Sequence, residues 1–124
     1  MHTMSKSQLE HLTAKLVTFR DARDWKQFHN PKDLAAALSI EAAELQELFL
    51  WKSPDQIDLS DPAKKTIVEE EVADIAAYLL LLCNELDIDL EEALSRKIDL
   101  NAAKYPADKV RGSSKKYTEY SEEI

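Results

Sequence analysis

Glycine, proline and cysteine are scarce in this sequence of 124 residues, which contains 1 Gly, 4 Pro and 1 Cys. So few glycines and prolines leave little material for tight hairpin turns and favour helices. With Gly112 as the sole glycine, neither the dinucleotide-binding motif G-x-G-x-x-G nor the phosphate loop G-x-x-x-x-G-K can form. The single Cys83 excludes an internal disulfide, which fits a reducing compartment.

Long apolar runs and an excess of positive charge are also absent. The longest uncharged apolar run, IAAYLLLLC at 75–83, is too short for a membrane helix of about 20 residues, and the start, MHTMSKSQ, has no apolar signal segment. The net charge of −8 argues against DNA or RNA binding, although bound divalent cations could still attract a small anionic substrate. We therefore expect a soluble, cytoplasmic protein that binds neither nucleic acid nor membrane.

The apolar spacing predicts four helices, over about 7–23, 31–51, 62–86 and 90–104. Each of the last three begins at a capping residue, which is Asn30, Asp61 or Asp89. Short connections between helices favour an all-α, antiparallel, four-helix bundle. We expect a single domain of residues 1–124, with a helical core over about 7–105 and an irregular tail over about 106–124.

The three glutamates of the second predicted helix are not equivalent. At about 100° per residue, Glu41 falls inside the apolar arc, Glu44 on its edge and Glu47 on the solvent side. The arc consists of Leu34, Leu38, Ala42, Leu45 and Phe49. Because glutamate is almost never buried unless it is paired or binds a metal, the inward pair needs a chemical reason.

The third predicted helix repeats this geometry. Glu71 lies within its apolar arc and Asp74 on the edge, again three residues apart. The arc consists of Val68, Val72, Ile75, Leu79, Leu82 and Leu86. A single acid at such an edge ordinarily reaches solvent, but four neighbouring carboxylates repel strongly without a cation. Oxygen ligands favour Mg²⁺, with Mn²⁺ as a possible substitute.

A ferritin-like di-iron site is the alternative metal centre for a helical bundle. That site needs Glu-x-x-His on two helices, whereas position 44 is Glu and position 74 is Asp in this sequence. The histidines, His2, His11 and His29, lie outside both helices that carry the acid pairs. Magnesium therefore fits the residues better than iron.

Basic and aromatic side chains complete the pattern. On the fourth predicted helix, Lys97 and Asn101 lie within the apolar arc, where they would suit phosphate oxygens, although a lysine stem can also pack with its ammonium group in water. Aromatic residues near helix ends or beside the acid pairs can stack on a nucleobase, although each alone is more often a core residue. Together these features predict a metal–polyphosphate site.

Most of the chain, about residues 7–118, resembles the MazG-like all-α nucleoside triphosphate pyrophosphohydrolases. IEAAELQELFLWK followed by VEEEVADIAAYLL resembles the ExxE…ExxD signature of that family. The segments RDWKQFHNPKDLAAAL, ELFLWK, SRKIDLNAAKYP and GSSKKYTEY are similar to its dCTP pyrophosphatase branch.

The resemblance implies a homodimer or homotetramer that hydrolyses a dNTP, namely dCTP or a modified dCTP, to dNMP and pyrophosphate with Mg²⁺, as nucleotide-pool house-cleaning. The metal ligands would be Glu41, Glu44, Glu71 and Asp74, the set that the helix angles select, with Glu41 or Glu44 activating water. The base would contact Trp25, His29, Trp51 and Tyr78. The phosphates would contact Lys97, Asn101, Lys104, Arg111, Lys115, Lys116 and Tyr117.

Two other classes of protein stay open. A regulatory helical module without catalysis would bind dNTPs but not turn them over, and a purely structural oligomerisation bundle would not respond to Mg²⁺. The intact acid quartet disfavours both classes, since neither needs it. Within the enzyme class, dUTP or dATP stays open as the preferred substrate.

Overall fold

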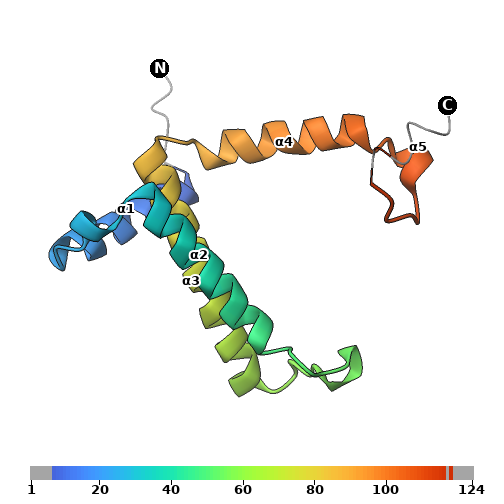
Figure 1. Cartoon of the computed structure of the whole chain (residues 1–124), viewed down its shortest axis with the longest axis horizontal. Helices are drawn as coiled ribbons and strands as arrows, with labels where there is room; N and C mark the ends of the chain where they lie inside the picture. Colours follow the sequence, from blue (N-terminus) through green and yellow to red (C-terminus); the bar gives the residue numbers. More distant parts are fainter. Residues whose placement is uncertain (1–6, 117, 119–124) are drawn as a thin grey trace. The chain divides into compact units, whose positions relative to one another are not determined.

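The computed structural model describes residues 7–116 and 118. Within this part of the chain the structure is all-α, as predicted, with five α-helices, two short 3-10 helices and no strand (Figure 1). The elements are α1 (Gln8–Ala22), η1 (Lys26–Phe28), α2 (Pro31–Glu47), η2 (Pro54–Gln56), α3 (Pro62–Leu86), α4 (Leu90–Lys104) and α5 (Ala107–Val110). None of the described helices is long and apolar enough to span a membrane.

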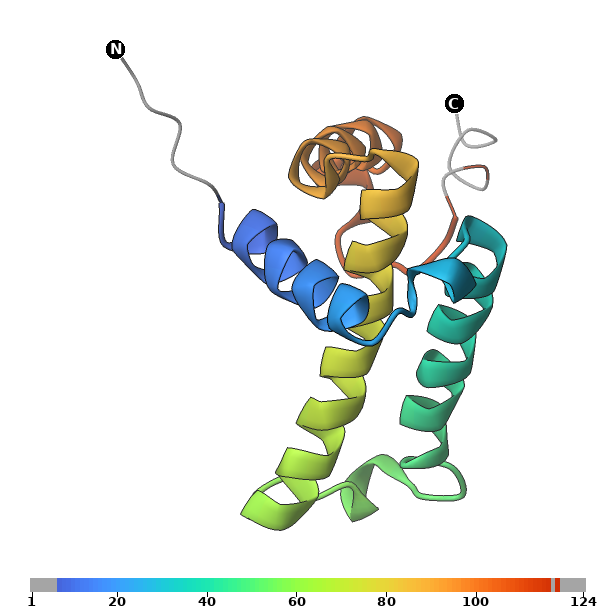
Figure 2. The same cartoon turned by 90° about the vertical axis from the view of Figure 1, so that its left-hand side faces the viewer.

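The chain divides into two compact units, Met1–Ile88 and Asp89–Ile124. In the first unit, α2 and α3 run antiparallel and side by side, and α1 packs against α3 (Figure 2). The second unit contains α4 and α5. The antiparallel pair α2–α3 is therefore established, whereas the expected four-helix bundle, which also requires α4, stays a prediction.

The helix starts follow the sequence signals closely. Asn30, Asp61 and Asp89 each accept a hydrogen bond from a backbone N–H two or three residues later, at 2.9, 3.0 and 3.1 Å. Each bond satisfies an N–H group that has no partner within the first turn of the helix. Pro31 and Pro62 occupy the first helical position, where the missing N–H costs nothing. The predicted starts of α2, α3 and α4 are thus confirmed.

The predicted end of the second helix is wrong, because α2 stops at Glu47 and does not reach Trp51. Beyond Glu47 the N–H groups bond three residues back, as in Phe49 N–H to the Gln46 carbonyl at 3.0 Å and Leu50 N–H to the Glu47 carbonyl at 3.3 Å. Trp51 then adopts a left-handed conformation with φ of 65°. That conformation turns the chain away from the helix axis and into the connection to α3.

The tail is also more ordered than predicted, because Ala107–Val110 forms α5. The carbonyl of Pro106 accepts hydrogen bonds from the N–H groups of Lys109 and Val110, at 2.9 and 3.1 Å. Pro106 cannot continue α4 because it lacks an N–H, but its fixed backbone suits the start of a new turn. One short helix therefore replaces part of the expected irregular segment.

The buried face of α3 differs from the predicted arc. Leu80, Leu81 and Cys83 are buried, whereas Val72 and Leu86 of the predicted arc are 49% and 47% exposed. The cause is that α3 is covered from two directions, by α2 and by α1. A single amphipathic arc describes a helix with one neighbour, so the pattern alone could not locate this second contact.

Candidate metal centre and adjoining pocket

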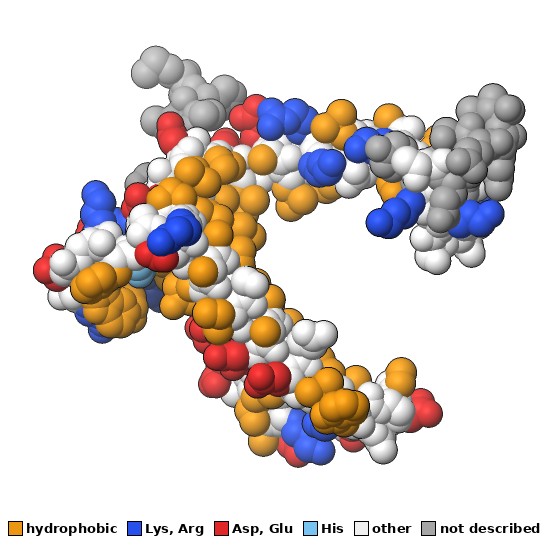
Figure 3. Space-filling model, viewed as in Figure 1, with side chains coloured by type: hydrophobic (Ala, Val, Ile, Leu, Met, Phe, Trp, Pro, Cys, Tyr) orange, Lys and Arg blue, Asp and Glu red, His pale blue; other side chains and the backbone are white. Residues whose placement is uncertain are grey.

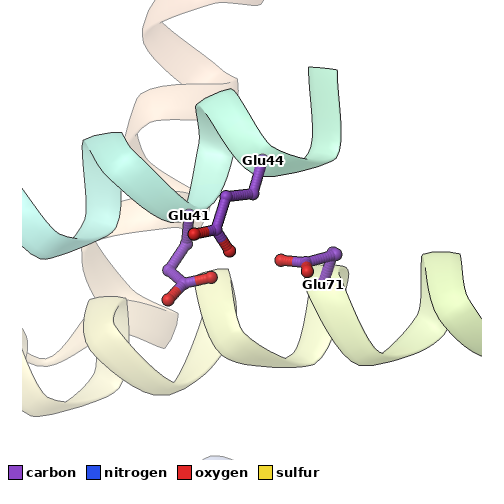
Figure 4. A group of neighbouring side chains, drawn as sticks. All are labelled: Glu41, Glu44 and Glu71. Atoms are coloured by element: carbon purple, nitrogen blue, oxygen red, sulfur yellow. The ribbon is translucent and has the colours of Figure 1, made fainter. Parts of the chain in front are cut away.

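Three carboxylates from α2 and α3 meet between the two helices. Glu41 and Glu44 lie on α2 and Glu71 lies on α3, and each offers an oxygen within 4.8 Å of the others (Figure 4). In the space-filling view, acidic side chains gather over the α2–α3 pair (Figure 3). The spacing of three residues along α2 places both of its glutamates towards α3. Three such oxygen ligands could hold a divalent metal ion.

The electrostatics of this cluster are unfavourable without a cation. Oε2 of Glu41 and Oε2 of Glu71 are buried and have no hydrogen-bond partner. The pKa of Glu41 is raised to about 7, mainly by burial and in addition by the neighbouring carboxyl groups of Glu44 and Asp74. Burial likewise raises the pKa of Glu71 above its usual value. A bound cation would be the partner that these buried carboxylate oxygens lack. The residues therefore fit a divalent metal ion.

Asp74 has a different place from the other three acids. It is exposed and is not one of the three residues whose oxygens meet within 4.8 Å. Its charge nevertheless acts on both Glu41 and Glu71, since it contributes to the raised pKa of each. The structure thus joins three of the four predicted ligands tightly and places Asp74 at their edge.

We expect the binding of Mg²⁺ to strengthen as pH rises from 6 to 8. The pKa of Glu41 is about 7 in the folded protein and 4.5 when unperturbed, so its ionisation opposes folding. This destabilisation is absent below about pH 4.5 and complete above about pH 7. At pH 6 the cation must displace a proton, whereas at pH 8 the carboxylate is already charged.

Thermal unfolding with Mg²⁺ titrated at pH 6 and pH 8 measures this coupling. The Mg²⁺ concentration at the midpoint of the stabilisation should be about tenfold lower at pH 8, since one proton of pKa near 7 competes with the metal. Glu47→Gln, on the same helix but outside the cluster, should leave the pH dependence intact. Equal midpoints at the two pH values would contradict the assignment of Glu41 as a ligand.

A pocket of about 650 Å³ adjoins the acid cluster. Glu41 and Asp74 line it together with Trp25, His29 and Tyr78, three of the four residues predicted to contact a base. Its remaining walls are mostly aliphatic and come from α1 and α3. Nδ1 of His29 is buried without a hydrogen-bond partner, so it can bond a polar edge of a ligand. The volume and the few polar groups are typical of a small-molecule site.

Trp25 is held in this wall by its aromatic neighbour. Its ring lies edge-on to Phe19, with centroids 5.8 Å apart and planes at 75°. The guanidinium of Arg23 lies 3.7 Å from the centre of the Phe19 ring and 6.0 Å from that of Trp25. Edge-to-face and cation–π contacts of this kind restrict the orientation of an indole.

Other predicted site residues are not brought to the pocket. Trp51 is 93% exposed and does not line it, because α2 ends before Trp51. The predicted phosphate-contacting residues belong to the second unit, and their role stays a prediction. These are Lys97, Asn101 and Lys104 on α4, and Arg111, Lys115 and Lys116 beyond α5, while Tyr117 lies outside the described residues.

The sequence pattern does not predict that α1 contributes to the pocket. Its residues Leu12, Lys15, Leu16, Phe19 and Arg20 all line the cavity. The apolar members follow a helical spacing of three or four residues, which predicts a buried stripe without saying whether the stripe faces a core or a cavity. Nothing in the local sequence singles out Arg20, since an arginine near a helix end is ordinarily exposed.

The chain belongs to the MazG-like family. A profile of that family matches residues 36–120, which include the acid cluster as well as α4 and α5. The resemblance to this family that the sequence segments indicate is therefore confirmed.

The chain is also similar to individual proteins whose names state an activity. The chain is 39% identical over 113 residues to human dCTP pyrophosphatase 1, covering 90% of this chain and 66% of the human protein. The bovine protein of that name is 38% identical over 117 residues, covering 93% and 69%. A crystal structure of a pyrophosphatase from Archaeoglobus fulgidus matches with a TM-score of 0.76 and 42% identity, covering 86% of this chain and 99% of that one. The predicted enzyme class, hydrolases of acid anhydrides, is thus confirmed for the family. The chain spans about two thirds of the length of the curated relatives that it matches.

Proposed function

We propose that the chain is a Mg²⁺-dependent nucleoside triphosphate pyrophosphohydrolase that converts a dNTP, preferentially dCTP or a modified dCTP, to dNMP and pyrophosphate. It would remove unwanted nucleotides from the cytoplasmic pool. The observation that carries this proposal is a continuous site in which Glu41 belongs both to the acid cluster and to the aromatic pocket. The names of the relatives support the choice of dCTP.

The chemistry that this site supports is hydrolysis at the α-phosphorus. The oxygen of a water molecule attacks that atom, the bond from the α-phosphorus to the bridging oxygen breaks, and pyrophosphate leaves. The carboxylate of Glu41 or Glu44 accepts the proton of the attacking water. A divalent cation held by Glu41, Glu44 and Glu71, with Asp74 beside them, would supply positive charge against the phosphate oxygens.

The pocket would position the nucleoside. Trp25 and Tyr78 supply aromatic surface for the base, and His29 supplies a ring nitrogen that can bond its edge. On the phosphate side, Lys97 and Asn101 lie one turn apart on α4 and can act together on one anionic group. Lys104, Arg111, Lys115, Lys116 and Tyr117 complete the proposed phosphate contacts.

Product analysis tests the reaction. The protein incubated with dCTP and Mg²⁺ should release dCMP and pyrophosphate in equal amounts, and chelation of the metal should stop the reaction. Parallel assays with 5-methyl-dCTP, dUTP, dATP and CTP give the base and sugar preference. Release of single phosphates would exclude attack at the α-phosphorus, and nucleotide binding without turnover would favour a regulatory module.

A homodimer or homotetramer is part of this proposal. Large apolar side chains are exposed throughout the described chain, and Trp51 at 93% is the extreme case. A second copy would remove such surface from water, which is favourable at about 25 cal/mol per Å² of apolar area. The molar mass in solution, measured by light scattering, should be two or four times that of the 14.1 kDa chain, and a monomer would refute this part.

A further inference from the structure

Among the described residues, Arg20 is the one charged residue that is buried. Only 3% of it is exposed, although it lies on α1 close to the end of the helix. Burying a guanidinium is costly unless its donors are paired. The burial of an arginine near a helix end, where it would ordinarily be exposed, therefore needs an explanation.

The side chain of Arg20 joins two helices. Its Nε donates a hydrogen bond to Oδ1 of Asp21 at 2.9 Å, and its Nη1 donates to Oε1 of Glu85 on α3 at 3.1 Å. Glu85 is itself partly buried, with a side-chain exposure of 22%. Bonds to charged partners in such surroundings are short and directional. The planar fork of Arg20 thus fixes the end of α1 against the last turns of α3.

The main chain of Arg20 holds Trp25. Its carbonyl accepts the N–H of Trp25 at 3.1 Å, and the carbonyl of Asp21 accepts the N–H of Asp24 at 3.1 Å. Asp24 adopts the left-handed conformation, with φ of 54°, that this helix ending requires. The ending places the Trp25 ring edge-on to Phe19, which precedes Arg20 in the sequence. The position of Trp25 therefore follows the position of Arg20.

We propose that Arg20 is a positioning residue for the base-binding wall of the pocket. Through Glu85 it holds the end of α1 on α3, and through its carbonyl it holds Trp25, so it fixes the distance between Trp25 and the α3 face that carries Tyr78. This role sets nucleotide affinity and base preference but not metal binding, because Arg20 is outside the acid cluster. The proposal rests on the proposed function.

Fluorescence tests the positioning without any need for activity. The chain has two tryptophans, so Trp51→Phe leaves Trp25 as the only indole. In that background, Arg20→Met and the milder Glu85→Gln should shift the Trp25 emission to longer wavelength and increase its quenching by acrylamide. Arg96→Met, which breaks an exposed 4.0 Å ion pair with Glu92 on α4, is the matched control and should change neither. Unchanged emission in folded Arg20 and Glu85 variants would overturn the proposal.

Kinetics separate positioning from a merely structural role. In Arg20→Met and Glu85→Gln we expect KM for dCTP to rise about tenfold, since misplacing a binding group by about 1 Å can cost up to about 100-fold. The preference for dCTP over dUTP should fall, while kcat and the Mg²⁺ dependence stay within about twofold, and Arg20→Lys should restore part of the loss. Unchanged KM and base preference in folded variants would overturn the proposal. A wild-type protein that hydrolyses no nucleotide would overturn the proposed function instead, while the fluorescence test would still report on Trp25.

Discussion

Replacing Glu71 by Gln is expected to lower Mg²⁺-dependent turnover of the nucleotide about 1000-fold. The amide keeps the size of the side chain but removes one of the three carboxylates that meet within 4.8 Å between α2 and α3. A metal ion contributes several kcal/mol to stabilising charge in such a reaction, and each 1.4 kcal/mol or so corresponds to a factor of ten in rate. Initial rates of pyrophosphate release at saturating nucleotide and Mg²⁺ give the comparison.

The same variant should be more stable than the wild type when no metal is present. The carboxylate that this substitution removes is repelled by Glu44 and Asp74, and its buried Oε2 has no hydrogen-bond partner. We therefore expect Glu71→Gln to raise Tm in EDTA and to lose most of the stabilisation by Mg²⁺. Glu47→Gln, on α2 but outside the cluster, should match the wild type in rate and in both melting curves.

These two readouts together decide the assignment. A variant that loses activity and also loses stability in EDTA would indicate general damage to the fold. One that retains full activity would exclude Glu71 from the metal site. The combination of lower activity with higher stability in EDTA is expected only of a cluster whose charges bind a metal ion and oppose folding when the metal is absent.

The acid cluster could be predicted from the sequence because helical geometry is local. Glu41 and Glu44 are three residues apart in a helix whose start at Asn30 is well marked, and Glu71 follows the equally clear start at Asp61. Once both helices are recognised, the side that each carboxylate faces follows from about 100° per residue. Antiparallel packing of the pair then brings the carboxylates together.

The rest depends on contacts that the local pattern does not contain. The apolar spacing predicts a helix that continues to Trp51, but the turns after Glu47 end α2 first. Arg20 gave no signal because its partner Glu85 lies 65 residues away in the sequence. The apolar spacing also fails to predict the buried face of α3, since α1 covers a part of this helix that a single amphipathic arc leaves out. Each failure concerns where a helix ends or what packs on its second side.

Replacing Trp25 is also expected to have a large effect, in this case on nucleotide binding, because aromatic stacking on a base contributes about 1–3 kcal/mol. Trp25→Ala is therefore expected to raise KM for dCTP by about 10- to 100-fold. The half-saturating Mg²⁺ concentration should not change, because Trp25 lines the pocket but is outside the acid cluster. With kcat reduced by no more than a few fold, the pattern would be that of lost nucleotide binding.

Phe28→Ala is the matched control for this prediction. Phe28 is an aromatic residue only three positions further on, 63% exposed, and it does not line the pocket. It should leave KM unchanged, while Trp25→Phe, which keeps an aromatic face of smaller area, should fall between Trp25→Ala and the wild type. If Trp25→Ala lowered kcat and left KM unaltered, Trp25 would act on the reacting phosphate and not on the base. A rise in KM of the same size in Phe28→Ala would instead indicate damage to the fold of the segment between α1 and α2, because both residues belong to that segment.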